Sequence, residues 1–140
     1  MEKRNKAGPP GKTILIVDDE FGILEVLEFI LNDAGFKVVS AVNGQEALAR
    51  LEETRPDLAI VDFMMPILDG NAVIKAIRSD NRLRDIPIIL VSALPEKTIR
   101  ERCDGYTTFL RKPYKTEQLM DEISKLLDYS ANNSFPKIVS

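Results

Sequence analysis

The stretch ILIVDDE, residues 14–20, joins an uninterrupted apolar run to three consecutive acids. Ile14–Val17 has the pattern of a strand that is buried on both faces, as in the centre of a parallel sheet. A buried strand that ends in Asp18, Asp19 and Glu20 needs a reason for so much negative charge. The acids either begin a helix, as caps and as partners of its dipole, or they hold a cation.

The rest of the chain alternates between strand and helix patterns. Apolar residues three and four positions apart predict an amphipathic helix after the first strand, with Gly35 at its end. Asn43 is predicted to cap a second helix, and a short fourth helix is expected at about Glu96–Arg102. The apolar stripe of the first helix is predicted to contain Ile23, Val26, Leu27, Ile30, Leu31 and Ala34. The predicted strands are Ile14–Val17, Val38–Val42, Leu58–Val61, Ile86–Val91 and Thr107–Leu110.

Five strand–helix units in alternation predict a parallel sheet covered by helices on both faces. The runs ILIV, LAIV and IILV are unbroken, whereas VVSAV and TTFL are more polar, so the second and fifth strands are the expected edges. The fold class is therefore α/β, a doubly wound (βα)5 three-layer sandwich with sheet order 2-1-3-4-5, which is flavodoxin-like. Such sheets bind ligands at the carboxyl ends of the strands, here between strands one and three.

Composition indicates a single domain and excludes several kinds of chemistry. The chain has 140 residues, 44% hydrophobic and 29% charged, with a net charge of -3, which is typical of a globular domain and gives no reason to expect direct contact with nucleic acid. The absence of histidine excludes Ser-His-Asp and Cys-His nucleophiles and most zinc sites. Cys103 is the only cysteine, which fits a cytoplasmic location. No apolar run is long enough for a membrane span. Residues 1–12 are expected to be a flexible arm, 13–128 the domain, and 129–140 a tail or the start of a linker.

Polar residues follow four of the predicted strands. Asp18 and Asp19 end strand one, Asp62 ends strand three, Ser92 ends strand four and Lys112 follows strand five. Each has an ordinary explanation alone, as a cap, a strand-end hydroxyl or a solvated charge, but the set is much harder to obtain by accident. Clustered carboxylates repel, and Mg²⁺ removes that cost. A lysine and a hydroxyl opposite a metal suit a phosphoryl group, and a carboxylate can be its nucleophile. The residues thus predict a magnesium-dependent phosphoryl acceptor on an aspartate.

The segments ILIVDDE, IVDFMMPILDG, ILVSA and FLRKPY, in this order, resemble the receiver domain of a two-component response regulator. The resemblance covers about residues 13–128. It implies that Asp62 is both the phosphoacceptor and a metal ligand, that Asp19 binds Mg²⁺ directly and Asp18 through water, and that the backbone carbonyl of Met64 is a further metal ligand.

The resemblance also implies a switch and partners. Ser92 is the switch hydroxyl, Lys112 binds the phosphoryl group, and Phe109 stands where the family has its switch aromatic. The donor is expected to be a phosphohistidine on a sensor histidine kinase or a histidine phosphotransfer protein. The output partner is expected on the face made by helix 4, strand 5 and helix 5, with homodimerisation on phosphorylation as a further expectation. The domain is not an enzyme beyond its own phosphotransfer and autodephosphorylation.

Two departures and several alternatives accompany this interpretation. The segment between Ser92 and Lys112 is slightly short for the family, and Phe109 lacks the hydroxyl of the commoner tyrosine. GPPGKT, residues 8–13, is not a P-loop, because an arm precedes it and a strand follows it. A haloacid dehalogenase-type phosphohydrolase needs an acid where Met64 stands. A nucleotide- or flavin-binding fold needs a glycine-rich loop where DDEFG stands, and a receiver that only docks does not need the complete set of site residues.

Overall fold

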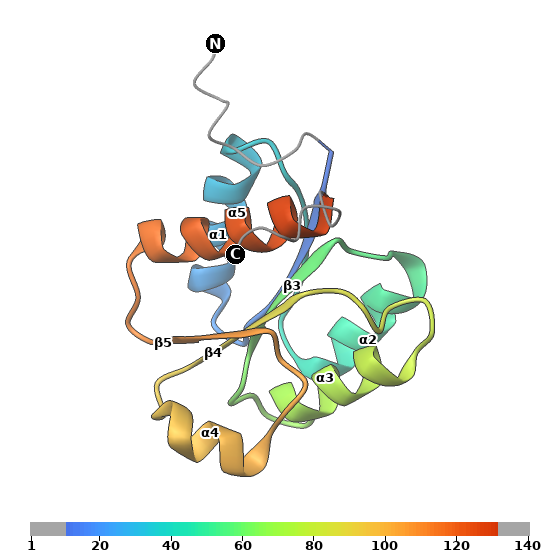
Figure 1. The fold of residues 1–140 in the computed structure, drawn as a ribbon, viewed down its shortest axis with the longest axis vertical. Coiled ribbons are helices and arrows are strands. Elements are labelled where there is room, and N and C mark those ends of the chain that lie inside the picture. Colours follow the sequence, from blue (N-terminus) through green and yellow to red (C-terminus); the bar gives the residue numbers. More distant parts are fainter. Residues whose placement is uncertain (1–10, 132–140) are drawn as a thin grey trace.

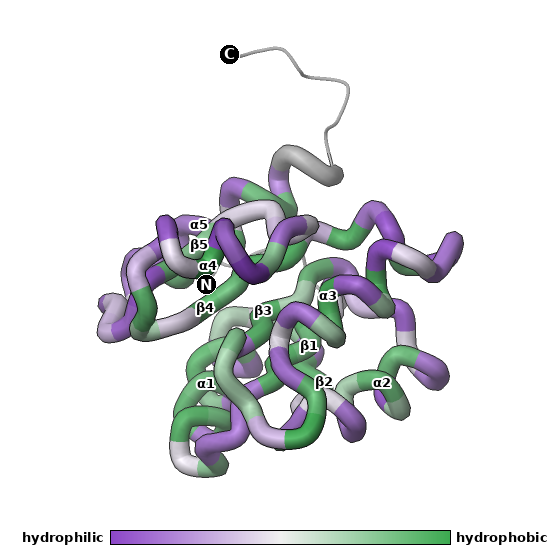
Figure 2. The backbone as a smooth tube through the Cα atoms, turned by 90° about the horizontal axis from the view of Figure 1, so that it is seen from below, coloured by the Kyte–Doolittle hydropathy of each residue, from purple (hydrophilic) through white to green (hydrophobic). Residues whose placement is uncertain are grey.

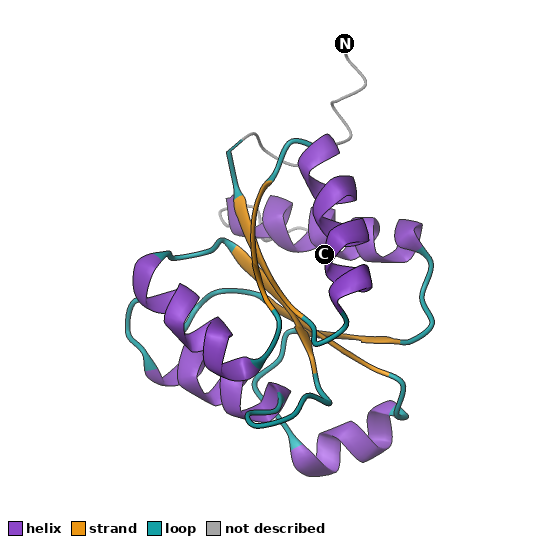
Figure 3. Cartoon of the chain, turned by 180° about the vertical axis from the view of Figure 1, so that it is seen from behind, coloured by secondary structure: helices purple, strands orange, loops and turns teal. Residues whose placement is uncertain are grey.

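Five parallel strands form one sheet with helices on both faces in the computed structural model, which describes residues 11–131 (Figures 1 and 3). The strand order is β2-β1-β3-β4-β5, as predicted. The strands are β1 (Thr13–Val17), β2 (Lys37–Ala41), β3 (Leu58–Asp62), β4 (Ile88–Ser92) and β5 (Thr108–Arg111). The helices are α1 (Phe21–Asp33), α2 (Gly44–Glu53), α3 (Gly70–Ser79), α4 (Glu96–Arg102) and α5 (Thr116–Ala131).

The edge strands are the two with mixed polarity, which confirms the prediction from the apolar runs. Every residue of β3 and β4 is buried. In contrast, β2 begins with an exposed residue and β5 ends with one. An interior strand of a parallel sheet is covered on both faces and cannot carry exposed polar side chains, whereas an edge strand can.

The sheet separates two hydrophobic cores because successive side chains of a strand point to opposite faces. Leu15 and Val17 of β1 pack on the face covered by α2 and α3, and this core also receives Ile99 of α4. Ile14 and Ile16 pack on the other face, beneath α1 and α5. Both cores reach the carboxyl edge of the sheet, where they support the loops that carry the predicted polar residues.

The predicted helix boundaries at Gly35 and Asn43 are confirmed. Gly35 follows α1 with φ of 99°, a left-handed conformation that glycine adopts without strain. The Asn43 side chain accepts a hydrogen bond from the Glu46 N–H at 2.7 Å and so caps α2. At the start of α1, however, Glu20 makes no side-chain capping bond. Helix capping by Glu20 therefore does not explain why three acids follow β1.

The predicted apolar stripe of α1 is partly wrong. Leu24, Leu27 and Leu31 are the buried residues of the helix, while Ile23 is 38% exposed and Val26 is 56% exposed. The helix is hydrophobic along most of its length (Figure 2), so more than one apolar stripe satisfies the spacing of three and four. The stripe that faces the sheet is the leucine one, and the other remains on the surface.

Several element ends differ from the predicted ones. β4 begins at Ile88 and not at Ile86, because Pro87 has no N–H to donate and the Ile86 carbonyl accepts a hydrogen bond from Arg78 at 2.7 Å. β2 and β5 are each shifted by one residue, and α5 continues to Ala131, beyond the predicted end of the domain at residue 128. Residues 1–10 of the expected arm and 132–140 of the expected tail lie outside the described residues. None of the helices in residues 11–131 is both long and apolar enough to cross a membrane.

Candidate functional site

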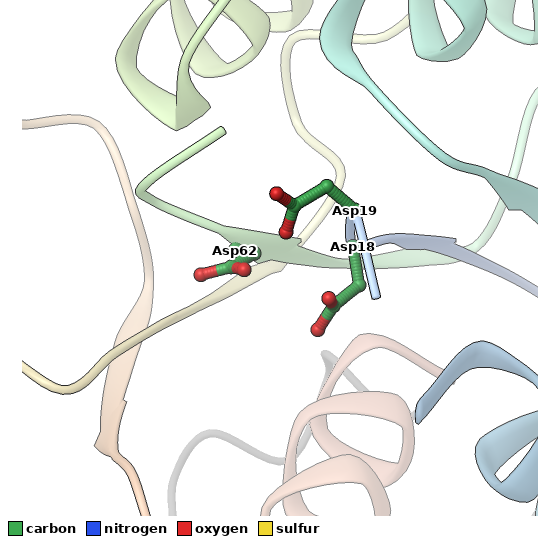
Figure 4. A group of neighbouring side chains, drawn as sticks. All are labelled: Asp18, Asp19 and Asp62. Atoms are coloured by element: carbon green, nitrogen blue, oxygen red, sulfur yellow. The ribbon is translucent and has the colours of Figure 1, made fainter. Parts of the chain in front are cut away.

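Three carboxylates meet at the carboxyl edge of β1 and β3. One oxygen of each of Asp18, Asp19 and Asp62 lies within 4.8 Å of the other two, and Figure 4 shows the three side chains around one space at the ends of these strands. Asp18 and Asp62 are only 5% and 6% exposed, whereas Asp19 is on the surface. Two nearly buried acids beside a third require a positive charge close by.

Lys112 supplies a positive charge from the other side of the cluster. Its Nζ lies 3.3 Å from Asp62 Oδ2 and 3.7 Å from Asp18 Oδ2. The lysine follows β5, and its backbone N–H donates to the Ser92 carbonyl at 2.9 Å, which fixes the start of the side chain. One lysine cannot neutralise three carboxylates, so the cluster keeps a net negative charge that a bound cation would neutralise.

The pKa values reflect this incomplete neutralisation. Burial raises the pKa of Asp62 to about 6; Lys112 opposes that shift and Asp18 adds to it. Burial also raises the pKa of Asp18, against a hydrogen bond from the Glu20 N–H and the charge of Lys112. Burial alone lowers the pKa of Lys112, but Asp62 and Asp18 outweigh it and the pKa is raised. Lys112 is therefore charged at neutral pH, and Asp62 is mostly ionised but easily protonated.

Local backbone contacts hold the acids in place. The Asp18 N–H donates to Ala41 of β2 at 3.1 Å, and the Asp18 side chain accepts from the Glu20 N–H at 2.8 Å. On the opposite side, Gly70 opens α3 against β3. A Cβ added to Gly70 would lie 2.7 Å from the Asp62 carbonyl oxygen and 2.8 Å from Phe63 Cα. The sequence analysis did not identify Gly70 as part of the site, although a glycine directly after the helix-capping Asp69 is a signal for such an approach.

Ser92 and Phe109 lie on the strands next to the cluster. Asp62 pairs in register with Val91, so Ser92 lies one residue beyond that pair. Ser92 is buried, and its Oγ accepts a hydrogen bond from the Leu94 N–H at 3.1 Å. Phe109 of β5 is half-buried and packs against the same core as Leu94.

Met64 lies in the loop between β3 and α3, with its side chain largely exposed. In this loop Ile67 has φ of 70° and an exposed side chain, and the Leu68 N–H donates to the Pro66 carbonyl at 2.8 Å across it. A left-handed conformation is rare for a β-branched residue and costs about 1–3 kcal/mol. The loop thus lies beside Asp62 with Phe63 and Met65 buried in the core and with Met64 and Ile67 exposed.

The donor set fits a hard divalent cation. Mg²⁺ takes oxygen ligands and keeps several waters, and the cluster offers carboxylate oxygens from Asp18, Asp19 and Asp62 at one exposed edge. The structure thus brings together the three predicted acids and Lys112. It places Ser92 on the adjacent strand, while the role of the Met64 carbonyl stays a prediction.

Comparison with known proteins agrees with the geometry. The family model of the response regulator receiver domain matches residues 14–124. The probable transcriptional regulator ycf27 of Cyanophora paradoxa is 37% identical over 125 residues, which cover 86% of this chain and 50% of the relative. This chain spans about half the length of the curated relatives it matches.

Two solved structures that are similar to this chain are described with magnesium. The receiver domain of a sensor histidine kinase from Pseudomonas aeruginosa PAO1, described with a magnesium ion coordinated in its active-site cleft, has a TM-score of 0.78 and 30% identity, covering 84% of this chain and 98% of that one. The response regulator TrrA of Thermotoga maritima, in complex with Mg²⁺ and BeF, has a TM-score of 0.74 and 33% identity, covering 83% of this chain and 99% of that one.

Proposed function

The chain belongs to the response regulator receiver family, and we propose that it accepts a phosphoryl group on Asp62 from a phosphohistidine of a partner protein. The observation that carries this proposal is the place of Asp62, nearly buried and 3.3 Å from Lys112. Asp18 is engaged by the Glu20 N–H and Asp19 is exposed. Asp62 is therefore the acid best placed to hold a phosphoryl group with its oxygens against a fixed cation.

The proposed step is an in-line displacement at phosphorus. A carboxylate oxygen of Asp62 bonds to phosphorus while the N–P bond to the partner's imidazole breaks. The electron pair stays on the imidazole nitrogen, which then takes up a proton. Lys112 and the Ser92 hydroxyl are the groups of this chain that bind the transferred oxygens. The domain thus catalyses only its own phosphorylation and the later hydrolysis of the acyl phosphate.

The metal belongs to the same proposal. Asp19 and Asp62 would hold Mg²⁺ directly, Asp18 through water, and the Met64 carbonyl would complete the protein ligands. When bound, Mg²⁺ neutralises charge on the phosphoryl oxygens and on the acids. Support comes from the three clustered carboxylates, which a single lysine leaves incompletely neutralised.

A protein donor is favoured by the surface beside the site. Within residues 11–128, whose side chains the structure describes, the exposed large hydrophobic side chains all lie on α1 or in the loop after β3: Phe21, Ile23, Val26, Phe29, Met64 and Ile67. The Phe29 side chain on α1 is 73% exposed. Large exposed apolar side chains are often buried in protein contacts, and a small phosphodonor has no use for them. We assign this surface to the donor protein.

The output contact is assigned to the face of α4, β5 and α5, which Ser92 and Phe109 adjoin. A change at Asp62 reaches this face through β4 and the loop after it. A second copy of the chain, bound after phosphorylation, is the other occupant of this face that the proposal includes. The proposal places the protein in the cytoplasm, where the buried thiol of Cys103 stays reduced.

The test of the acceptor uses acetyl phosphate with magnesium and the intact mass of the protein. Wild type is expected to gain one phosphoryl group and Asp62→Asn none, since an amide is no nucleophile here. Asp33→Asn, at the exposed end of α1, is the matched control and is expected to behave as wild type. A phosphoryl group on Asp62→Asn at the wild-type rate contradicts the assignment.

The test of the donor surface compares two donors. Phe29→Ser is expected to slow transfer from a phosphorylated histidine kinase by roughly tenfold, the order seen for loss of an apolar contact, and to leave the reaction with acetyl phosphate unchanged. Asn32→Ser on the same helix is the control. Equal slowing with both donors would mean that Phe29 affects the site and not the docking.

A further inference from the structure

Helix α4 is weakly attached to the body of the domain. It has seven residues, its N-cap is Pro95 without a side-chain capping bond, and Ile99 is its buried residue. Figure 1 shows it at the end of the sheet, entered from β4 and left toward β5. An element with so little buried apolar surface opens at low free-energy cost, so single polar contacts decide where it sits.

One such contact fixes the first turn of the helix. The Tyr106 hydroxyl donates a hydrogen bond to Glu96 Oε2 at 3.2 Å. The same carboxylate oxygen lies 3.5 Å from Arg100 Nη1, one turn along α4. Burial and the Glu96 carboxylate raise the pKa of the Tyr106 phenol, so the phenol keeps its proton and is the donor at neutral pH. The contact joins the loop before β5 to the N-terminal turn of α4.

Tyr106 also contacts the proposed switch aromatic. Its ring centroid lies 6.3 Å from that of Phe109, with the planes tilted by 55°. Both rings pack with Leu94 against the core that includes Leu90. In register, Leu90 pairs with Phe109, so Phe109 and Ser92 are on the same face of the sheet, the one that α4 covers. The ring of Phe109, which has no hydroxyl, thus lies next to the ring of Tyr106, which has one.

The far end of α4 is anchored independently. The Arg78 guanidinium of α3 donates to the Gly105 carbonyl at 2.8 Å and also to the carbonyls of Arg84 and Ile86. A Cβ at Gly105 would lie 3.0 Å from Ile74 Cγ2, and its φ is 92°. The loop after α4 is therefore fixed to α3, so the N-terminal turn of the helix is the end that can move once the bond from Tyr106 to Glu96 breaks.

Ser92 connects the site to that turn. Its hydroxyl oxygen accepts from the Leu94 N–H, and Glu96 follows two residues later. If Ser92 turns its hydroxyl toward a phosphoryl group on Asp62, the Leu94 N–H loses its acceptor, and the loop that carries Glu96 is released. Separation of Glu96 from Tyr106 is then the step that frees the helix.

We propose that the hydrogen bond from Tyr106 to Glu96 is a latch that holds the N-terminal turn of α4 in the unphosphorylated protein and opens when Asp62 is phosphorylated. The opening of the latch on phosphorylation, called the release below, rests on the proposed function. The restraint on α4 in the unphosphorylated protein, called the hold, does not. In this chain the hydroxyl absent from Phe109 is supplied by Tyr106, and it acts on α4 from outside the site. Tyr106 and Glu96 are positioning residues, because neither touches the reacting groups.

Hydrogen–deuterium exchange of the amides of α4, read by mass spectrometry, tests the latch. In the unphosphorylated state, Tyr106→Phe and Glu96→Ala are each expected to speed exchange in residues 96–103 by roughly threefold, the effect of one part-exposed hydrogen bond. The double variant is expected to exchange no faster than Glu96→Ala alone, because Glu96→Ala already removes the bond from Tyr106 together with the ion pair to Arg100. Glu101→Ala, an equal charge change on the exposed side of the helix, is the control. Unchanged exchange in Tyr106→Phe overturns the latch.

Acetyl phosphate and magnesium test the release on the same proteins. Wild type is expected to speed its α4 exchange on phosphorylation, while Tyr106→Phe, already open, responds less than half as much. Intact mass records whether the phosphoryl group was added. A protein that gains no phosphoryl mass contradicts the proposed function and the release with it, while the comparison of unphosphorylated variants still decides the hold. A phosphorylated wild type with unchanged α4 exchange contradicts the latch alone.

Discussion

Around Asp62 the backbone has no spare room, whereas α4 rests on the sheet through one buried side chain, Ile99. The acid is fixed by the strand it ends, by Lys112, and by the close approach of Gly70. The first turn of the helix is held to the loop before β5 by one hydrogen bond, from Tyr106 to Glu96. Phosphoryl transfer needs atoms held to a fraction of an ångström, and a signal needs an element that moves at little cost. The rigid surroundings of Asp62 suit phosphoryl transfer, and the weak attachment of α4 suits signalling.

The contrast in packing is sharpest at two glycines. Gly70→Ala places a methyl group 2.7 Å from the Asp62 carbonyl, so we expect a loss of about 3 kcal/mol in the free energy of unfolding. Gly22→Ala in α1 has nothing within 4 Å of the new methyl and is expected to stabilise by about 0.5 kcal/mol or more. Urea unfolding of both variants measures this. A Gly70→Ala protein as stable as wild type would show that the backbone beside Asp62 can yield.

The contrast in charge appears in the pH dependence of stability without metal. The folded state raises the pKa of Asp62 to about 6, above the ordinary value of about 3.9 for an unfolded chain. Folding therefore favours the protonated acid, and the unfolding free energy falls as pH rises from about 4 through 6, by on the order of 2 kcal/mol.

Asp62→Asn lacks this dependence and is expected to be more stable than wild type at pH 7.5 and similar to it at pH 4.5. Denaturant unfolding in the presence of EDTA gives the two differences. Glu101→Gln in α4 is the control, expected within about 0.5 kcal/mol of wild type at both pH values. A difference between Asp62→Asn and wild type that stays constant with pH would contradict the raised pKa.

Magnesium should remove the repulsion at the site and leave α4 unaffected. Binding to the folded state alone stabilises by about 1.4 kcal/mol at roughly ten times Kd. Asp19→Asn is expected to weaken the response, and Asp33→Asn to preserve it. Thermal melts with and without millimolar magnesium measure it. A wild-type melting temperature that does not change with magnesium counts against a metal site.

The smallest predicted effect concerns the lifetime of the phosphorylated state. The side chains two residues beyond Asp62 and Ser92 are Met64 and Leu94, and neither can orient an attacking water by a strong hydrogen bond. Met64→Asn is expected to speed dephosphorylation several-fold, corresponding to about 1 kcal/mol. The half-lives of both proteins in excess magnesium decide this. A half-life for Met64→Asn equal to or longer than that of wild type refutes the role of Met64.

The sheet and the acids were predictable from the sequence because their signals are local. An unbroken run such as ILIV specifies an interior strand, and parallel strands bring their carboxyl ends together whatever the loops do. Asp18, Asp19 and Asp62 therefore had to be neighbours. The ion pairs of Lys112 add detail to that position but do not change it.

What the sequence did not determine depends on contacts between segments. The exposed stripe of α1 could not be separated from the buried one, since Val26 and Leu27 fit the same spacing. The place of Gly70 directly after Asp69 indicates a helix start, but its close approach to the Asp62 carbonyl depends on how α3 packs against β3. The bond between Tyr106 and Glu96 joins two residues whose types and spacing predict nothing individually. In each case the missing information is which side of a helix or loop faces the rest of the domain.

Transfer from a phosphorylated histidine kinase is the most direct test of the central claim that Asp62 receives the phosphoryl group. Each phosphorylated kinase of the source organism is mixed with wild type and with Asp62→Asn, and the fate of the phosphoryl group is followed by mass spectrometry and peptide mapping. The expected result is that, with at least one kinase, the group leaves the kinase histidine and appears on Asp62 of wild type, while Asp62→Asn receives none. A phosphoryl group mapped to any other residue, or transfer to Asp62→Asn at the wild-type rate, would contradict the account.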